Sequence, residues 1–330
     1  MMNQGILSKL IDLYFDVVIL SYNSEKYLDR CIESCLKQTH HFHKIIIIDN
    51  NSEDMSREII EKFSQYHPSI TTVFLNENTG FSKGMNIGIS LSTSDWVLCL
   101  NSDMYLNEYF IESAAQEIYH TKDIGSVCGK VYRWDPPHEI DSVGNTLNYR
   151  FTLKNEKNTE DQRFVFGANG CSPLYKRKML EEMKVGSQYF DEKYFAYMED
   201  TDLAWRAYLG GWKTLYIPRA VAWHKRSAVY NGKVSFWSKP FQVRYLVLIN
   251  RYRTILKNFN LISLFLLFPY FLVSETFLWS YLILRSKEYF FVFFRIIKQL
   301  IHERNYLIYW KNQLNMKRKK SYLSVLKHIR

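Results

Sequence analysis

Acidic side chains gather at two places in the sequence where carboxylates could do chemistry. Asp103 ends the segment LNSD at residues 100–103, directly after an apolar run, and Glu199, Asp200 and Asp202 fall within four consecutive residues. A carboxylate beside a buried strand is costly unless it faces solvent or a cation, so Asp103 could bind a divalent metal ion. A carboxylate of the second group could act as a general base.

Each of these groups also has a purely structural explanation. The residues Asn-Ser-Asp after a strand are typical of a turn and a helix cap, and Asp49, in the segment DNNS at residues 49–52, has the same alternative. A helix cap explains one of the three carboxylates at 199–202 and leaves the others for a function. His224 ends an apolar run, and a lone histidine is more often structural than a metal ligand.

Strand and helix patterns alternate through the first hundred residues and must position these groups. Runs rich in β-branched residues predict strands at 15–20, 44–48, 71–75 and 96–100, and apolar residues at helical spacing predict helices at 24–38, 56–66 and from about Phe81. Strands this apolar are buried on both faces, which predicts a mostly parallel sheet covered by helices. The predicted fold class is therefore α/β.

Polar segments follow three of the predicted strands, at residues 21–23, 49–52 and 101–103. Ligands of open α/β sheets bind beyond the carboxyl ends of the strands, so these segments should share one site. The pattern from 105 to 226 is mixed and shows no linker. We therefore predict one domain over residues 1–230, with a ligand-binding half at about 14–104 and a second half at 105–230, followed by a helical region at 231–330.

Charge is divided unevenly between these two regions. Residues 231–330 hold 18 Lys and Arg against 3 Asp and Glu, whereas residues 1–230 hold 25 against 30. Long apolar runs are interleaved with the basic residues of the tail, which suits an anionic membrane surface better than nucleic acid. We therefore predict a membrane partner and no nucleic-acid partner.

The tail contains a stretch, Asn258 to Leu284, that is apolar for long enough to span a bilayer. Pro269 interrupts it and Glu275 lies inside it, so we predict a helical hairpin or an in-plane pair of helices rather than one span. A hydrophobic helix packed on the first domain is the soluble alternative. The basic cluster MKRKK at 316–320 favours the membrane because clustered Lys and Arg bind anionic headgroups.

Cysteine usage and the N-terminus bear on the compartment. The five cysteines form no CxxC pair, which indicates neither a disulfide framework nor a zinc site and fits a reducing compartment. Residues 1–15 lack the apolar run and the charge order of a secretory signal. We therefore expect a cytoplasmic protein that is peripheral or monotopic at the inner face of the cell membrane.

Six short motifs follow one another along the chain. They are DVVILSYN at 16–23, IDNNS at 48–52, NTGF at 78–81 with Gly84 and Asn86, LNSD at 100–103, GANG at 167–170 and EDTDL at 199–203. In this order they resemble the family 2 glycosyltransferases of the GT-A fold, and within them the rhamnosyltransferase-like branch, from about Asp16 to His224. Glycines at 78–88 would permit a tight loop and close approach of the backbone to a donor.

The resemblance implies an inverting transferase that takes a sugar from a UDP or dTDP donor. Ser21 and Asp49 would hold the base and ribose, and Asp103 and His224 would hold Mn²⁺ or Mg²⁺ at the diphosphate. Asp200 would be the base that deprotonates the acceptor hydroxyl. The other site residues that the resemblance implies are Asn23, Asn78, Gly80 and Asn101 at the donor, and Glu199, Asp202 and Asn169 at the acceptor or in support.

Asn101 departs from the family pattern, because many members carry the first aspartate of a DxD motif at that place. The amide still offers a carbonyl oxygen to a metal ion, but its lack of charge predicts a lower affinity.

The basic, apolar tail favours a growing glycan or a lipid-linked acceptor for a surface polysaccharide. Two other functions stay open. A sugar-nucleotide nucleotidyltransferase shares a similar core but should carry a Gly-rich, Arg-containing loop where this chain has SYNSE at 21–25. A non-catalytic sugar-binding or scaffold protein of a polysaccharide assembly would not need the carboxylates around Asp200. Since Asp49, Asp103, Asp200 and His224 all precede Gly232, we expect the first domain to fold and bind donor without the tail.

Overall fold

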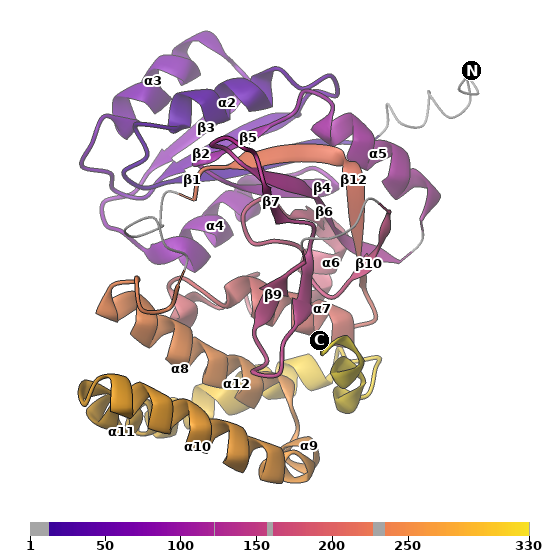
Figure 1. Cartoon of the computed structure of the whole chain (residues 1–330). Coiled ribbons are helices and arrows are strands. Elements are labelled where there is room, and N and C mark those ends of the chain that lie inside the picture. Colours follow the sequence, from indigo (N-terminus) through magenta and orange to yellow (C-terminus); the bar gives the residue numbers. More distant parts are fainter. Residues whose placement is uncertain (1–12, 122, 157–160, 227–234, 330) are drawn as a thin grey trace.

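The computed structural model describes residues 13–121, 123–156, 161–226 and 235–329 (Figure 1). Most of the segment that we judged not to be a secretory signal lies outside the described residues, as do Gly232 and the first residues of the tail.

The first hundred residues form the parallel side of a central sheet. Its strands are β1 (Phe15–Ser21), β2 (Lys44–Asp49), β3 (Ile70–Phe74) and β4 (Trp96–Asn101), and they alternate with α2 (Leu28–Leu36), α3 (Ser56–Tyr66) and α4 (Gly80–Leu91). The strands lie in the order β4-β1-β2-β3, with every neighbouring pair parallel. The predicted α/β class is confirmed, and the main shift is that α2 begins at Leu28 rather than at Ser24.

Side chains of β1 alternate between two apolar cores on the two faces of the sheet. Val17 and Ile19 pack in one core with residues of α2, α3 and α5 (Phe110–His120). Val18 packs in the other with residues of α4, α6 (Arg177–Met183) and α7 (Glu199–Leu209). Because successive residues of a strand point to opposite faces, a strand covered on both sides needs an unbroken apolar run, which is the pattern in the sequence.

The second half of the chain extends the same sheet. Its further strands are β5 (Met104–Leu106), β6 (Ile124–Arg133), β7 (Ile140–Ser142), β10 (Arg163–Val165), β11 (Leu174–Lys176) and β12 (Lys213–His224), with a separate hairpin of β8 (Asn145–Leu147) and β9 (Leu153–Asn155). β11 lies antiparallel between β4 and β6 and joins the two halves. The full order is β10-β12-β6-β11-β4-β1-β2-β3, with β5 on β12 and β7 on β6.

The tail forms a helical layer below the sheet in Figure 1. Its elements are α8 (Phe241–Asn258), α9 (Leu261–Leu266), α10 (Phe268–Arg285), α11 (Glu288–His302), α12 (Arg304–Asn315) and the 3₁₀ helix η2 (Tyr322–His328). Pro269 lies in the first turn of α10, where a proline is tolerated because no helical donor is lost. Among the described residues, no helix has both the length and the apolar character that crossing a membrane requires.

Buried ion pairs tie α8 to the first domain. The ammonium of Lys257 lies 2.6 Å from Asp191 Oδ2 and 3.2 Å from Asp202 Oδ1, and all three side chains are fully buried. Arg206 also pairs with Asp202 at 2.8 Å. Removing one partner of a buried pair costs roughly 3–5 kcal/mol, because the charge left behind has no counterion. These contacts argue against our expectation that the first domain folds without the tail.

The basic cluster at 316–320 packs on the first domain rather than standing clear of it. The backbone N–H groups of Lys319 and Lys320 donate to the carbonyl of Leu209 at the end of α7, at 2.8 and 3.0 Å. The ammonium of Lys320 lies 3.8 Å from the centre of the Tyr208 ring. The end of a helix presents unpaired carbonyls and partial negative charge, which explains why a basic segment settles there. The side chains of Arg318 and Lys319 stay exposed, so the headgroup-binding role of this cluster stays a prediction.

Candidate functional site

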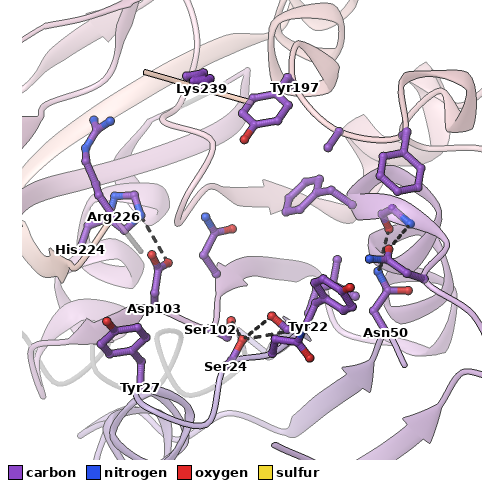
Figure 2. A pocket seen from close by; sticks show the side chains of 18 of the residues that line it. Tyr22, Ser24, Tyr27, Asn50, Ser102, Asp103, Tyr197, His224, Arg226 and Lys239 are labelled. Atoms are coloured by element: carbon purple, nitrogen blue, oxygen red, sulfur yellow. Dashed lines mark hydrogen bonds and ion pairs between the residues drawn. The ribbon is translucent and has the colours of Figure 1, made fainter. Parts of the chain in front are cut away.

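A cavity of about 520 Å³ opens beyond the carboxyl ends of β1, β2 and β4 (Figure 2). The three polar segments that follow these strands all contribute to it, as predicted. Residues from the second half and the tail complete the wall. The polar and aromatic residues that line it are Tyr22, Asn23, Ser24, Tyr27, Asn50, Asn78, Phe81, Asn101, Ser102, Asp103, Phe195, Tyr197, His224, Arg226, Ser238 and Lys239.

Asp103 and His224 meet at one side of this cavity (Figure 2). β5 pairs antiparallel with β12 so that Met104 faces His224, which brings the preceding Asp103 beside the imidazole. His224 Nε2 lies 3.4 Å from Asp103 Oδ1, and Nδ1 lies 3.2 Å from Asp141 Oδ2. A histidine whose second ring nitrogen is held by a carboxylate is the usual arrangement at metal sites.

This arrangement fits a divalent cation. Neighbouring octahedral ligands of Mg²⁺ lie about 3 Å apart, close to the separation of the Asp103 and His224 ligand atoms. Burial by itself lowers the pKa of His224, but Cys171 and the carboxylates of Asp103 and Asp141 hold it well above its usual value. The pair of carboxylates thus favours positive charge at this place. The described residues contain no group of three His, Cys, Asp or Glu side chains that could hold an ion alone, so a ligand would have to supply the other oxygens.

Ser21 and Asp49, the predicted base and ribose ligands, lie side by side at the ends of β1 and β2. Both side chains are buried, and neither lines the cavity as it stands. Within the described part of the chain, Ser21 Oγ and Asp49 Oδ1 have no hydrogen-bond partner, while Asp49 Oδ2 accepts from the Ser52 N–H at 3.2 Å. Buried polar atoms are rarely left unpaired, so a ligand that reaches them would gain two hydrogen bonds.

Asn50 has a role that the sequence analysis missed. Its amide donates to Asn78 Oδ1 at 3.0 Å, and its Oδ1 accepts from the Thr79 N–H at 2.9 Å. The N–H of Gly80 donates to the same Asn78 oxygen at 2.9 Å. These bonds fix the loop before α4 against the end of β2. The polar segment 49–52 was recognised as a site, but nothing in it distinguished Asn50 from its neighbours.

Two glycines of α4, Gly84 and Gly88, serve packing inside the protein, which corrects the role that we gave them. A Cβ at Gly84 would lie 2.5 Å from Leu20, and one at Gly88 would lie 2.2 Å from Val18, so both glycines let α4 approach β1. Gly80, at φ +80°, is approached by Phe195: an added Cβ would lie 2.6 Å from the Phe195 carbonyl oxygen. Only Gly80 lines the cavity, since Gly84 and Gly88 are directed at the sheet.

The acidic cluster occupies the first turn of α7, as its pattern predicted. Burial raises the pKa of Asp200, and burial with the neighbouring Asp200 charge raises the pKa of Glu199 to about 8. Asp200 Oδ1 accepts from the Thr201 N–H at 2.6 Å. A Cβ added to Gly170 would lie 2.6 Å from Asp200 Oδ2, so the glycine makes room for the carboxylate. Neither Glu199 nor Asp200 lines the cavity; the preceding Phe195, Ala196 and Tyr197 do.

Asp202 and Asn169 are both buried, and the structure places them away from the cavity lining. Asp202 is committed to Lys257, Arg206 and Asn258, so of the two roles we predicted, acceptor or support, these contacts favour support. Asn169 Oδ1 accepts from the N–H and hydroxyl of Ser172, both at 3.2 Å. These bonds hold the turn that carries Gly170 against Asp200.

Two cations at the cavity were also missed. Lys239 lies across the cavity from Ser24 and Ser102, with its ammonium 4.6 Å from the centre of the Tyr197 ring (Figure 2). Burial and the nearby Arg226 lower the pKa of Lys239. Arg226 itself pairs with Asp141. Arg226 could have been found from its place two residues after His224, whereas no local pattern marks Lys239.

The sequence matches a profile of the family described as glycosyl transferase family 2 over residues 16–184. Glycosyltransferase GlyG of Streptococcus pneumoniae serotype 4 is 33% identical over 133 residues, which cover 40% of this chain and 42% of GlyG. The poly-beta-1,6-N-acetyl-D-glucosamine synthase of Staphylococcus aureus is 24% identical over 207 residues, or 62% of this chain and 48% of the synthase. The chain thus spans about half the length of these relatives.

Solved structures share the fold. The structure of GalNAc-T7 with UDP, GalNAc and Mn²⁺ superposes with a TM-score of 0.60 at 16% identity, over 74% of this chain and 48% of that one. TarS 1–349 of S. aureus superposes with a TM-score of 0.50 at 19% identity, over 73% and 72% of the two chains. The predicted GT-A architecture is confirmed by this likeness.

Proposed function

Because the chain belongs to glycosyl transferase family 2, we propose that it transfers a sugar from a UDP or dTDP donor to a hydroxyl acceptor, with inversion. The observation that carries the proposal is the placement of His224 at the wall of the cavity, with one ring nitrogen beside Asp103 and the other beside Asp141. A carboxylate and an oriented imidazole beside a polar cavity suit an ion that binds a diphosphate. The rhamnosyltransferase-like branch stays a prediction.

Donor binding uses two ends of the site. The Asp49 carboxylate accepts hydrogen bonds from the base or ribose, and the Ser21 hydroxyl can donate or accept one, roles supported by their buried, unpaired oxygens. Asp103 and His224 would hold Mn²⁺ or Mg²⁺ beside the diphosphate, since these ions favour carboxylate and phosphate oxygens. When bound, the ion neutralises the charge that builds on the leaving diphosphate. Lys239 and Arg226 add positive charge to the wall of the cavity.

Asp200 acts as the general base in this proposal. It takes the proton of the acceptor hydroxyl while the acceptor oxygen bonds to the anomeric carbon, and the bond from that carbon to the diphosphate oxygen breaks on the opposite face. The configuration at the carbon inverts. Burial raises the pKa of Asp200, which makes it a stronger base once it is ionised. The acceptor would enter beside α7, because Asp200 stands outside the present cavity lining.

An anionic membrane surface is the second partner we propose. The helices α9, α10 and α11 expose a series of large apolar side chains that the described residues leave uncovered: Leu261, Ile262, Phe265, Leu266, Phe268, Leu272, Val273, Phe277, Leu284, Phe290, Phe291, Phe294 and Ile301. Soluble proteins seldom expose so many together. Exposed Arg285, Lys287, Arg295 and Lys298 lie on the same helices and suit anionic headgroups.

This surface supports a peripheral or monotopic position at the inner face of the cell membrane, with helices lying in the interface. A membrane-bound enzyme meets a lipid-linked or growing surface glycan without leaving the bilayer, which supports that class of acceptor. The cytoplasmic location is part of the same proposal.

A thermal-shift panel of nucleotide sugars with and without Mn²⁺ tests the donor assignment. A ligand at 100 times its Kd stabilises the folded protein by about 2.7 kcal/mol. We expect UDP or dTDP sugars to raise Tm in Mn²⁺ and much less in EDTA. Stabilisation by no nucleotide sugar would favour the sugar-binding or scaffold alternative, and formation of a sugar nucleotide from a sugar phosphate would favour the nucleotidyltransferase.

A further inference from the structure

The loop between η1 (Glu192–Tyr194) and α7 has an unusual backbone. Phe195, Tyr197 and Met198 have φ angles of 60°, 70° and 74°, in the left-handed region that side chains other than glycine seldom adopt. Such residues cost of order 1–3 kcal/mol each and persist only where the surroundings impose them. The loop also matters for chemistry, because it lines the cavity and leads directly into the turn that carries Asp200.

One side chain of the tail holds this loop. Asn250, fully buried in the middle of α8, donates from Nδ2 to the carbonyls of Tyr194, Ala196 and Tyr197 at 2.9, 3.0 and 2.8 Å. An amide has two hydrogens, so three acceptors share them and the group has no donor capacity to spare. Three backbone carbonyls of the loop are thereby directed at α8.

The amide is itself fixed by a buried pair. Arg253 donates to Asn250 Oδ1 and to the carbonyl of Lys193, both at 2.7 Å, and its guanidinium binds Glu303 at 2.7 and 2.9 Å. Asparagine is a poor residue for the interior of a helix, costing up to about 0.7 kcal/mol relative to alanine. Its place in α8 is explained by the loop contacts rather than by the helix.

From these contacts we propose that Asn250 is a positioning residue of the transferase: it fixes the backbone at 194–197, and through it the cavity wall and the α7 turn that carries Asp200. The inference rests on the proposed role of Asp200. The helix α8 lies between the sheet and the helices α10 and α11 (Figure 1). The proposal therefore gives the tail a role at the active site as well as an exposed apolar surface.

The test compares full-length Asn250→Asp and Asn250→Ala with a control, Glu275→Gln. Asp keeps the shape of Asn but removes both donors. Glu275 pairs with Arg251, the neighbour of Asn250 on α8, at 2.6 Å. Within the described part of the chain, its carboxylate also accepts from the Tyr252 hydroxyl of α8 and forms no hydrogen bond with the loop. The control thus loosens the same helix from α10 while the loop contacts stay intact.

Two readouts are taken at a temperature where every variant is folded. In hydrogen exchange, we expect the peptide covering 194–203 to exchange about tenfold faster in both Asn250 variants than in Glu275→Gln, as the loss of one or more hydrogen bonds implies. In nucleotide release from a UDP or dTDP sugar with Mn²⁺, we expect kcat to fall about 100-fold, the scale of a 1 Å misplacement. The Kd for the released nucleotide, UDP or dTDP, should change less than fivefold.

Equal exchange of that peptide in the Asn250 variants and the control would overturn the proposal, as would loss of folded protein in both Asn250 variants, which would make the residue structural. The exchange readout does not depend on catalysis. A wild-type protein that releases no nucleotide from any donor, yet shows the loop-specific exchange, would remove the proposed function and keep the role of Asn250 in fixing the loop.

Discussion

Nε2 of His224 lies 3.4 Å from Oδ1 of Asp103, although the two residues come from distant parts of the chain. The antiparallel pairing of β5 with β12 creates this proximity, and Asp141 holds the other ring nitrogen. The pairing of β12 with the strand that follows the first acidic motif thus builds a two-ligand site that neither segment could build alone.

Replacing Asp141 tests whether this histidine is an oriented ligand. We expect Asp141→Asn to weaken Mn²⁺ binding in the presence of UDP by about 10–100-fold, because partners of ligating histidines contribute on that scale. Calorimetric titration of Mn²⁺ measures it. Asp135→Asn is the matched control, since Asp135 is a more exposed acid that pairs with Lys225. An unchanged Mn²⁺ affinity in Asp141→Asn would show that His224 is not a metal ligand oriented by Asp141.

Asp200→Asn should abolish most transfer and spare the donor. We expect kcat to fall at least about 100-fold, as loss of a general base implies, with the Kd for UDP within about threefold of wild type. Steady-state nucleotide release and UDP titration measure the two quantities. Glu199→Gln is the comparison, and it should keep more than a tenth of wild-type kcat. The reverse ranking would transfer the base role to Glu199.

The raised pKa of Glu199 predicts how stability responds to pH. Its pKa is about 8 in the folded protein, against 4.5 for an ordinary glutamate, so the folded state holds its proton more tightly than the unfolded state. Glu199 therefore costs stability as pH rises above 4.5, and the cost is complete above about pH 8. We expect Glu199→Gln to raise Tm by about 4 °C or more at pH 9 and to leave it unchanged at pH 4.5. Equal Tm values at pH 9 would refute the burial of an acid there.

Charges placed on the apolar surface should prevent membrane binding. Phe277 and Phe291 are 74% and 73% exposed on α10 and α11, so Phe277→Glu with Phe291→Glu should leave the fold intact. We expect wild type to sediment with anionic liposomes and the double variant to stay in solution, because burying a charge in the interface opposes insertion. Tyr66→Glu, at a site 73% exposed on α3, is the control and should sediment like wild type. Sedimentation of the double variant would show that another surface binds.

Much of the fold followed from local patterns. The strands at 15–20, 44–48 and 96–100 were recognisable because a strand buried on both faces carries an unbroken apolar run, as the two cores on either side of β1 require. The three polar strand ends converge because β1, β2 and β4 are parallel, so their carboxyl ends lie at the same edge of the sheet. The acidic turn at α7 was also visible, since the helix dipole favours carboxylates there.

The missed residues depend on contacts that no local pattern encodes. Lys239 and Asn250 reach the site from the tail, and the hydrogen bonds of Asn250 run to backbone carbonyls, which leave no signature in the side-chain sequence. The tail was interpreted through its charge and apolar runs. Lys257 contributes to that charge, yet it is buried between Asp191 and Asp202 and belongs to the core. Net charge does not distinguish a paired lysine from an exposed one.

The most direct measurement is calorimetric titration of UDP and dTDP into the full-length protein in Mn²⁺ and again in EDTA, with Asp103→Ala beside the wild type. If Asp103 and His224 hold the ion that binds the diphosphate, one of these nucleotides binds wild type in Mn²⁺ and loses at least about tenfold in affinity in EDTA, a change of about 1.4 kcal/mol. Asp103→Ala in Mn²⁺ should then match the wild type in EDTA. Nucleotide affinity that is the same with and without Mn²⁺, and in both proteins, would contradict the account.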